Sequence, residues 1–262
     1  MSSEKIFARA YERLRSLKSF GPLTDLAAVA RKGGDVRIFV ALRQDWLRLF
    51  GIKTVVDIGS NVGQFAVAAM RAFPDAQIHC FEPLPSCFAT LEGRLVRHDR
   101  VSLHNVAVSD MDSVAMMRQS SFSPSSSLMK MSPLHESEFP FTEGGTEVEV
   151  QVTTLDHALL GVELPSPILM KIDTQGSEHR VLSGGRSVLE KTDVAILETS
   201  YEPLYEGQTF FPELYETMRS AGFEFRGFLG ELRSRRSGRL LQSDSIFVRS
   251  SPSGAMPTGL HE

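Results

Sequence analysis

Apolar and polar positions along the chain follow two different periods. Short runs rich in β-branched residues predict buried strands at 54–58, 78–81, 101–104, 168–172 and 194–197. Two stretches between them, 63–73 and 85–96, have apolar residues at the spacing of a helix. Strands that alternate with helices indicate βαβ units, so the pattern predicts an α/β fold with a doubly wound, mostly parallel sheet.

The last third of the chain departs from this alternation. Residues 211–221 have the spacing of a helix, and the strand-like runs 223–228 and 243–248 follow it. The connection between these runs is too short for a crossover helix, so we expect an antiparallel C-terminal hairpin. The arginine-rich run 233–239 falls at its tip, where solvated side chains are expected and a binding patch is the alternative.

Helical spacing also predicts two helices ahead of the first strand, at 4–18 and 36–50. The first is amphipathic, and its apolar face could pack on the main domain, close over a pocket or join two copies of the chain. We therefore predict a helical extension over 1–50, a cofactor-binding domain over 51–250 and a tail over 251–262.

A polar stretch, 119–145, interrupts the middle of the predicted domain and is rich in Ser and Pro. It is too long for an ordinary connection, so we expect either a functional loop or a flexible one. Residues 146–152 then alternate between polar and apolar, which predicts a half-exposed strand.

Composition excludes several classes of protein. Of the 262 residues, 42% are hydrophobic and 23% are charged, as in ordinary globular proteins. The net charge of −4 gives no general attraction to nucleic acid or to an anionic membrane. No apolar run has the length of a membrane span, and the N-terminus does not resemble a secretory signal. With only Cys80 and Cys87 and no CxxC, we expect a cytoplasmic protein without structural zinc.

One motif follows the first predicted strand and leads into a helix: VVDIGSNVGQF, residues 55–65. Ligands of open α/β sheets bind beside such turns. Gly59 and Gly63 allow the backbone to approach a ligand, or simply shape a tight turn. Asn61 stands where a dinucleotide site has its second glycine, so the motif favours a cofactor without phosphate. The carboxylate of Asp57 suits a cationic amino-acid group.

A second acidic residue follows the next strand. Glu82 comes about 20 residues after the glycine turn, where a carboxylate accepts hydrogen bonds from ribose hydroxyls. Pro83 fixes the chain behind it. Asn105 and Ala107 follow the third strand and are placed to border an adenine ring. These positions indicate nucleoside binding; a solvated carboxylate and a strand bend are the simpler alternatives.

Acidic residues also stand at the ends of the next two strands. Asp173 follows 168–172, and Glu198 follows 194–197. Such carboxylates position a hydroxyl substrate, accept its proton or hold a divalent cation. Glu178 opens a helix, so compensation of the helix dipole is an equal alternative to a functional role. His179 has the pKa of a general base, although an exposed helix histidine fits the pattern equally well.

Taken together, these motifs resemble the FkbM family of S-adenosylmethionine-dependent methyltransferases. KIDxxGxExxVLxGG is specific to this family, whereas the first motif is common to many methyltransferases. The predicted hairpin is also typical of the class I methyltransferase fold. The matching segments are VVDIGSNVGQF (55–65), CFEPLPSCFATL (80–91), NVAVSD (105–110), SSSL (125–128), VTTLD (152–156), KIDTQGSEHRVLSGG (171–185) and ILETS (196–200).

The resemblance implies O-methylation of a sugar, a glycolipid saccharide or a polyketide-type hydroxyl, with S-adenosylmethionine as the cofactor. It implies cofactor binding by Asp57, Gly59, Asn61, Gly63, Glu82 and Asn105. The expected cofactor site is completed by Ser60, Phe65, Pro83, Ala107 and Asp173. The catalytic candidates are Asp173, which we expect to assist proton removal, Glu178 and His179, with Asp156 a weaker one.

Gln175 departs from the KIDxEG of many family members. An amide neither takes a proton at neutral pH nor neutralises a cation, so metal ligands stay unassigned and a Mg²⁺ requirement stays open. The departure also keeps open a module that binds the cofactor without catalysis. An NAD-dependent oxidoreductase is a further alternative, which Asn61 and the hairpin disfavour. We expect a small-molecule substrate and no nucleic-acid partner, and a homo-oligomer stays open.

Overall fold

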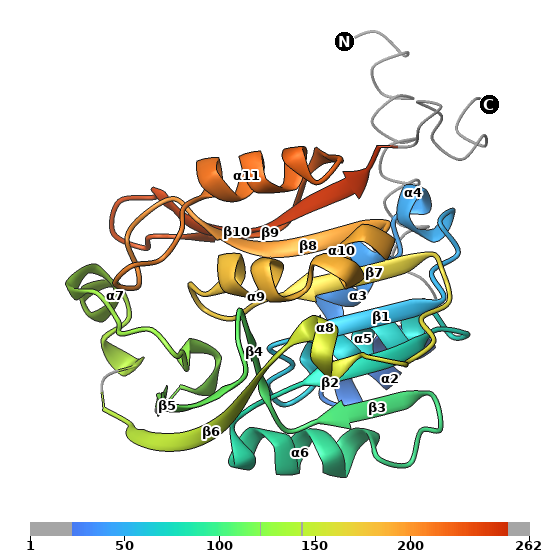
Figure 1. Cartoon of the computed structure of the whole chain (residues 1–262), viewed down its shortest axis with the longest axis horizontal. Coiled ribbons are helices and arrows are strands. Elements are labelled where there is room, and N and C mark those ends of the chain that lie inside the picture. Colours follow the sequence, from blue (N-terminus) through green and yellow to red (C-terminus); the bar gives the residue numbers. More distant parts are fainter. Residues whose placement is uncertain (1–22, 121, 143, 251–262) are drawn as a thin grey trace, which may run out of the picture.

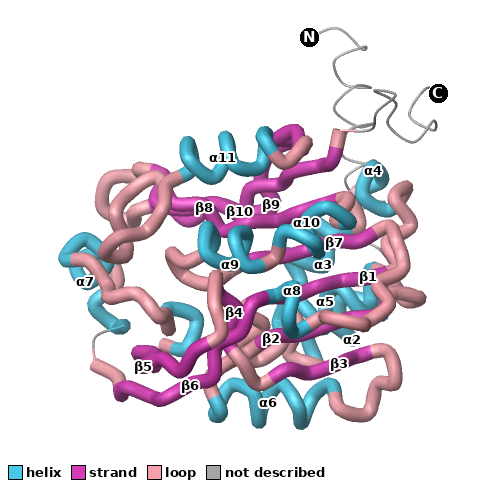
Figure 2. The backbone as a smooth tube through the Cα atoms, in the orientation of Figure 1, coloured by secondary structure: helices cyan, strands magenta, loops and turns pink. Residues whose placement is uncertain are grey.

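The centre of the molecule is a seven-stranded sheet with strand order β3-β2-β1-β7-β8-β10-β9. The computed structural model describes residues 23–120, 122–142 and 144–250. Figures 1 and 2 show helices on both faces of the sheet. Its strands are β1 (Thr54–Ile58), β2 (Gln77–Phe81), β3 (Val101–His104), β7 (Ile168–Ile172), β8 (Val194–Ser200), β9 (Phe223–Arg233) and β10 (Leu240–Arg249).

Strand pairing confirms the predicted topology. From β3 to β8, neighbouring strands run parallel, and β1 sets Asp57 opposite Cys80 on one side and Lys171 on the other. β10 is antiparallel to both β8 and β9. The sheet is therefore doubly wound and mostly parallel, with the C-terminal antiparallel hairpin of a class I methyltransferase fold.

Strand side chains alternate between two hydrophobic cores, one on each face of the sheet. Val55 and Leu169 belong to one core, and Val56 and Met170 belong to the other. The first core is covered by α2 (Leu23–Arg31), α3 (Val36–Leu42), α5 (Gln64–Ala72) and α6 (Pro85–Leu95). The second is covered by α8 (Leu155–Ala158), α9 (Glu178–Gly184), α10 (Arg186–Lys191) and α11 (Phe211–Ser220).

A second, three-stranded sheet lies beside the first, with the order β4-β6-β5. β4 (Ala107–Ser109) is parallel to β6 (Thr146–Thr154), and β5 (Ser113–Gln119) is antiparallel to it. β6 confirms the predicted half-exposed strand. The sequence did not predict β5, because most of its residues are exposed or half-buried and it has no run of buried apolar positions.

One further prediction needed correction. The helix expected over 36–50 is broken at Arg43 and Gln44 into α3 and α4 (Asp45–Arg48), and α2 was not predicted. Asp35 caps α3, since its side chain accepts hydrogen bonds from the backbone N–H groups of Arg37 and Ile38. The helix expected over 4–18 lies outside the described residues.

The polar stretch 119–145 contains short helical turns: η1 (Ser123–Ser125), α7 (Pro133–Glu138) and η2 (Pro140–Thr142). The arginine-rich run lies at the tip of the β9–β10 hairpin as predicted, where Arg233 pairs with Glu231 and Arg239 pairs with Glu202. Within the described part of the chain, no helix combines the length and apolar character needed to cross a membrane.

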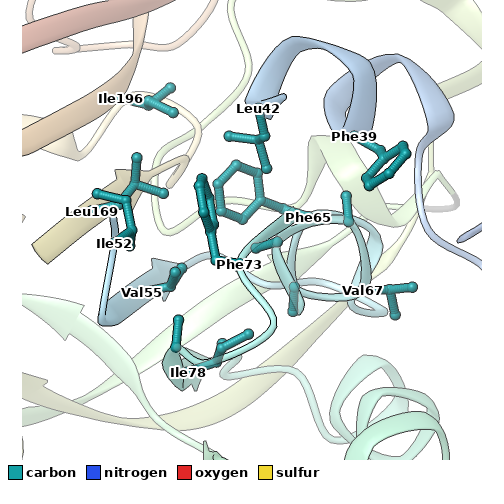
Figure 3. Packing of buried hydrophobic residues seen from close by; sticks show 14 of the residues in the cluster. Phe39, Leu42, Ile52, Val55, Phe65, Val67, Phe73, Ile78, Leu169 and Ile196 are labelled. Carbon is teal, nitrogen blue, oxygen red and sulfur yellow. The ribbon is translucent and has the colours of Figure 1, made fainter. Parts of the chain in front are cut away.

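The N-terminal helix α3 shares the first core with α5. Figure 3 shows Phe39 and Leu42 of α3 packed near Phe65. We expect Phe39→Ala to lower the free energy of unfolding by about 3–5 kcal/mol, because Phe39 is fully buried and its loss leaves a cavity. Urea denaturation measures the loss, with Leu49→Ala, 47% exposed, as a control expected within about 0.5 kcal/mol. A loss below about 1 kcal/mol at Phe39 would favour a domain boundary at residue 50.

Candidate active site

A cavity of about 490 Å³ lies at the carboxyl ends of β1, β2 and β7. Ligands of doubly wound sheets bind at this edge, and the volume falls within the roughly 300–1,000 Å³ of small-molecule sites. One part of its lining is apolar and includes Ile58, Phe81, Val106, Ala107 and Val108. The other part carries the carboxyl groups of Asp35, Glu82, Asp173, Glu198 and Asp244.

The turn after β1 is pressed against the loop after β7. Gly59 has a φ of 83°, and a Cβ atom there would lie 1.9 Å from the carbonyl oxygen of Asp173. The backbone N–H of Asp173 also donates to the carbonyl of Ile58 over 3.0 Å. Only glycine fits this contact, so the predicted close approach is made to the backbone of Asp173. Gly63, with a φ of 91°, begins α5 and does not line the cavity.

Glu82 lines the cavity with its carboxylate held by the backbone. One oxygen accepts the N–H of Asn61 and the other accepts the N–H of Leu84, each over 2.8 Å. Burial raises the pKa of Glu82 to about 7, although these hydrogen bonds oppose the shift. Each oxygen keeps a lone pair for a further donor. Asn105 supports this corner from outside the cavity, because its amide donates to the carbonyls of Glu82 and Pro83.

Lys171 stands between two carboxylates from neighbouring strands. Its Nζ lies 2.9 Å from Oδ2 of Asp173 and 3.9 Å from Oδ1 of Asp57. Burial works against the ammonium charge, yet Asp173 and Asp57 hold the pKa of Lys171 above its usual value. Asp57 is wholly buried, and burial raises its pKa against the attraction of Lys171. The cavity lining includes Lys171 and not Asp57, so Asp57 acts on the site through Lys171.

Gln175 connects two acidic side chains of the cavity. Its Nε2 donates to Oδ1 of Asp173 over 2.8 Å and to Oε2 of Glu198 over 2.9 Å. Its Oε1 accepts the hydroxyl of buried Tyr205 over 2.6 Å. If the amide were rotated by 180°, its oxygen would face two carboxylates and repel them. These hydrogen bonds therefore determine which way the Gln175 amide points. The amide of Gln175 therefore connects the two carboxylates, whereas a glutamate at this position would add a third negative charge beside them.

The serine-rich stretch forms one wall of the cavity. Ser123, Pro124, Ser126 and Leu128 all line it. The hydroxyl of Ser123 donates to the Asn61 side chain, and that of Ser127 donates to the carbonyl of Gln175. Residues 123–128 of the polar stretch are thus part of the site and are hydrogen-bonded to the turns after β1 and β7.

Glu178 and His179, which we expected as catalytic candidates, both lie outside the cavity lining. Oε1 of Glu178 accepts hydrogen bonds from the backbone N–H groups of Thr174 and Gly176 and from the Thr174 hydroxyl. Burial raises the pKa of Glu178 to about 7. The structure gives Glu178 the role of holding the loop that carries Gln175.

Most of the predicted cofactor residues come together. Those that line the cavity are Gly59, Ser60, Asn61, Phe65, Glu82, Pro83, Ala107 and Asp173. Those that do not are Asp57, Gly63 and Asn105. Asp156 is also elsewhere, since its carboxylate accepts the backbone N–H groups of Ser187 and Val188 at the start of α10.

Sequence reasoning missed Lys171, Asp244 and Tyr205 as parts of the site. Lys171 carried a signal, because a lysine inside an otherwise apolar strand needs a buried partner. Asp244 carried the same signal in the second hairpin strand; burial, then repulsion by Asp173, raises its pKa to about 6. Tyr205 lies in a loop and gave no signal. Among the described residues, no group of three or more His, Cys, Asp or Glu is arranged to hold a metal ion.

Comparison with known proteins now decides the family. A model described as the methyltransferase FkbM domain matches residues 57–225, which is more than half of the chain. The chain belongs to the FkbM methyltransferase family. This membership confirms the resemblance read from the motifs. It also removes the support for an NAD-dependent oxidoreductase.

Two curated relatives show the extent of the similarity. The "2-O-methyltransferase NoeI" of Sinorhizobium fredii is 32% identical over 59% of this chain, which spans just under two thirds, 66%, of that protein. The "31-O-demethyl-FK506 methyltransferase FkbM" of Streptomyces tacrolimicus is 28% identical over 64% of this chain and 72% of its own length. The solved methyltransferase FkbM of Methylobacillus flagellatus is 12% identical, with a TM-score of 0.45, over 86% of this chain and 58% of its own.

The raised pKa of Glu82 predicts a pH dependence of stability. Its folded pKa of about 7 exceeds the ordinary value of 4.5, so its protonated form stabilises the protein below pH 4.5. That contribution, about 3 kcal/mol, is lost as the pH rises through 7. We expect Glu82→Gln to remove this part of the decline in urea unfolding between pH 4.5 and 8, whereas the exposed control Glu92→Gln keeps it. Parallel pH curves for Glu82→Gln and the wild type would contradict the assignment.

Proposed function

We propose that this protein transfers the methyl group of S-adenosylmethionine to a hydroxyl of a small molecule, a sugar, a glycolipid saccharide or a polyketide-type alcohol. Family membership supports methyl transfer. The observation that supports this donor best is that one cavity combines an apolar strip with an acidic region. Among the described residues of its lining, Lys171 is the buried cation, and Arg37 is exposed and paired with Asp35. Such an environment attracts a cationic nucleoside and repels the pyrophosphate of a dinucleotide.

The residues of the cavity fit the donor at both ends. Glu82 is held by two backbone N–H groups in a position to accept ribose hydroxyls, and the apolar residues Val106, Ala107 and Val108 suit an adenine ring. Gly59 allows the turn after β1 to lie directly against the backbone of Asp173. Both carboxylate oxygens of Asp57 lack hydrogen-bond partners among the described residues, and we assign Asp57 the role of holding Lys171.

When bound, S-adenosylmethionine supplies a methyl group activated by a sulfonium charge. The protein's own part is to orient the acceptor hydroxyl and to receive its proton. Orientation alone can supply roughly 7–11 kcal/mol of the lowering of the barrier. A carboxylate near the attacking hydroxyl can accept its proton. We therefore assign proton acceptance to the acidic group of Asp173, Glu198 and Asp244.

The acceptor class rests on the relatives and on the chemistry of the cavity. The names of the two curated relatives specify methylation at oxygen, one at a 2-O position and one of 31-O-demethyl-FK506. Carboxylates accept hydrogen bonds from hydroxyl groups, and the acidic lining of this cavity offers several of them. A hydroxyl-rich acceptor fits both observations.

Methyl transfer is the direct test of this function. The full chain is incubated with S-adenosylmethionine labelled in its methyl group and with methyl glycosides of glucose, fucose and N-acetylglucosamine, a short glycolipid and a macrolide alcohol, with and without Mg²⁺. We expect label in at least one acceptor, at the oxygen of a hydroxyl. Binding of the donor in calorimetry without transfer to any acceptor would instead favour a module that does not catalyse.

Removal of the Glu82 carboxylate tests the donor site separately. We expect Glu82→Ala to weaken S-adenosylhomocysteine binding about 10- to 100-fold, since charge-assisted hydrogen bonds contribute about 1.5–3 kcal/mol. Titration calorimetry measures the affinity, and Glu92→Ala on the exposed face of α6 is the matched control. Equal affinity of Glu82→Ala and the wild type would rule out the ribose contact.

A further inference from the structure

Glu198 stands where two cavities meet. It lines the donor cavity of about 490 Å³ and also a second cavity of about 470 Å³ beside the β9–β10 hairpin. Both cavities share Asp35, Arg37, Ile38, Glu198, Leu232 and Asp244. The second cavity lacks the apolar strand-end residues that suit an adenine, so it is the place for the acceptor. A group at the junction can reach the atoms that react.

Asp173 and Glu198 differ in how their carboxylate oxygens are engaged. Both carboxylate oxygens of Asp173 are engaged, one with Lys171 and the other with Gln175. Glu198 uses only Oε2, which accepts from Gln175; within the described ranges of the chain, Oε1 accepts no hydrogen bond. Glu198 is also only partly buried, so Oε1 is accessible from the cavity.

We propose that Glu198, and not Asp173, accepts the proton of the acceptor hydroxyl, and that Gln175 and Tyr205 hold Glu198 in position for this task. The assignment rests on the proposed methyl transfer to oxygen. In the step, the hydroxyl oxygen forms a bond to the methyl carbon, and the methyl–sulfur bond breaks with its electron pair left on sulfur. The hydroxyl proton passes to the Glu198 carboxylate, which becomes a neutral carboxylic acid.

The surroundings of Glu198 make its carboxylate a better base than an exposed one. Burial raises its pKa well above 4.5, and repulsion by neighbouring carboxylates adds to the rise. The charged groups that act on it are Asp173, Glu178 and Asp244, which raise the pKa, and Lys171, which lowers it; the Tyr205 hydroxyl lies beyond Gln175. A bound cation favours the ionised form of the Glu198 carboxylate, which is the form that accepts a proton.

Gln175 and Tyr205 act as positioning residues. The backbone of Gln175 has a φ of 55°. Its side-chain amide extends between Asp173 and Glu198, and its amide oxygen accepts the hydroxyl of buried Tyr205. This arrangement leaves the amide hydrogens for the two carboxylates alone. A glutamate at 175 would lose both donations and add a charge beside Glu198.

Glu198→Gln is the first test, in the full chain with the acceptor that the transfer assay identifies. We expect kcat to fall about 10²- to 10⁴-fold, the usual contribution of a general base, while the Kd of S-adenosylhomocysteine changes less than about threefold. The limb of the pH profile of kcat that reports deprotonation of the base should disappear. Glu213→Gln on the exposed face of α11 is the matched control and keeps wild-type turnover. Wild-type turnover and an unchanged pH profile in Glu198→Gln would overturn the proposal.

Gln175→Glu separates positioning from folding. We expect the same limb of the kcat profile to move to higher pH by about one unit, because the added charge raises the pKa of Glu198. Tyr205→Phe, which frees the amide oxygen, should lower kcat without that shift. An unmoved pH limb in Gln175→Glu would show that Gln175 does not act on the base.

A measurement without turnover distinguishes failure of this proposal from failure of the proposed function. Sinefungin carries an amine in place of the methylsulfonium group, so its cation should displace a proton from Glu198 when it binds. Calorimetry in buffers of different ionisation enthalpy counts the released protons, and we expect a smaller count in Glu198→Gln than in the wild type. A wild type that transfers no methyl contradicts the proposed function. Equal proton counts in the two proteins contradict the role of Glu198.

Discussion

The ammonium group of Lys171, held between Asp57 and Asp173, is the interaction on which the geometry of the site depends. The register of the sheet sets Asp57 directly opposite Lys171, so the pairing of β1 with β7 brings the two charges together. Taking three charged groups out of water is costly, and their attraction offsets this cost only in a well-ordered arrangement. Here the order comes from the two buried strands. The ion group stabilises the ends of β1 and β7 as one platform.

That platform restricts the backbone around it. The carbonyl of Asp173 lies so close to Gly59 that a side chain there would separate the two loops. With Gly59 in place, the turn after β1 positions the backbone N–H of Asn61 to donate to Glu82. The loop after β7 positions the side chain of Gln175 to donate to Glu198. The Glu82 side and the Glu198 side of the cavity are therefore both positioned by one close contact between neighbouring strands. Glu178 completes it by binding the backbone of residues 174 and 176.

The sequence predicted the parts of this arrangement that depend on local pattern. The strands, the antiparallel hairpin and the strand-end position of Glu82 followed from periodicity and from turn chemistry. The parts that depend on register or on long loops were not accessible. Nothing local distinguishes Lys171 as the partner of Asp57, and Tyr205 reaches Gln175 from a loop 30 residues away. β5 was also not predicted, because a mostly exposed strand has no run of buried apolar residues.

The charges of the site do not balance in the protein alone. The buried cation Lys171 faces Asp57, Asp173 and Asp244, and Glu178 and Glu198 lie close by. Burial and mutual repulsion raise the pKa values of Asp57, Glu178, Glu198 and Asp244, and a bound cation would act in the opposite direction. Gln175 limits the excess, since its amide connects two carboxylates without adding a charge. A site built this way gives up stability at neutral pH and gains attraction for a positively charged ligand, such as the proposed donor.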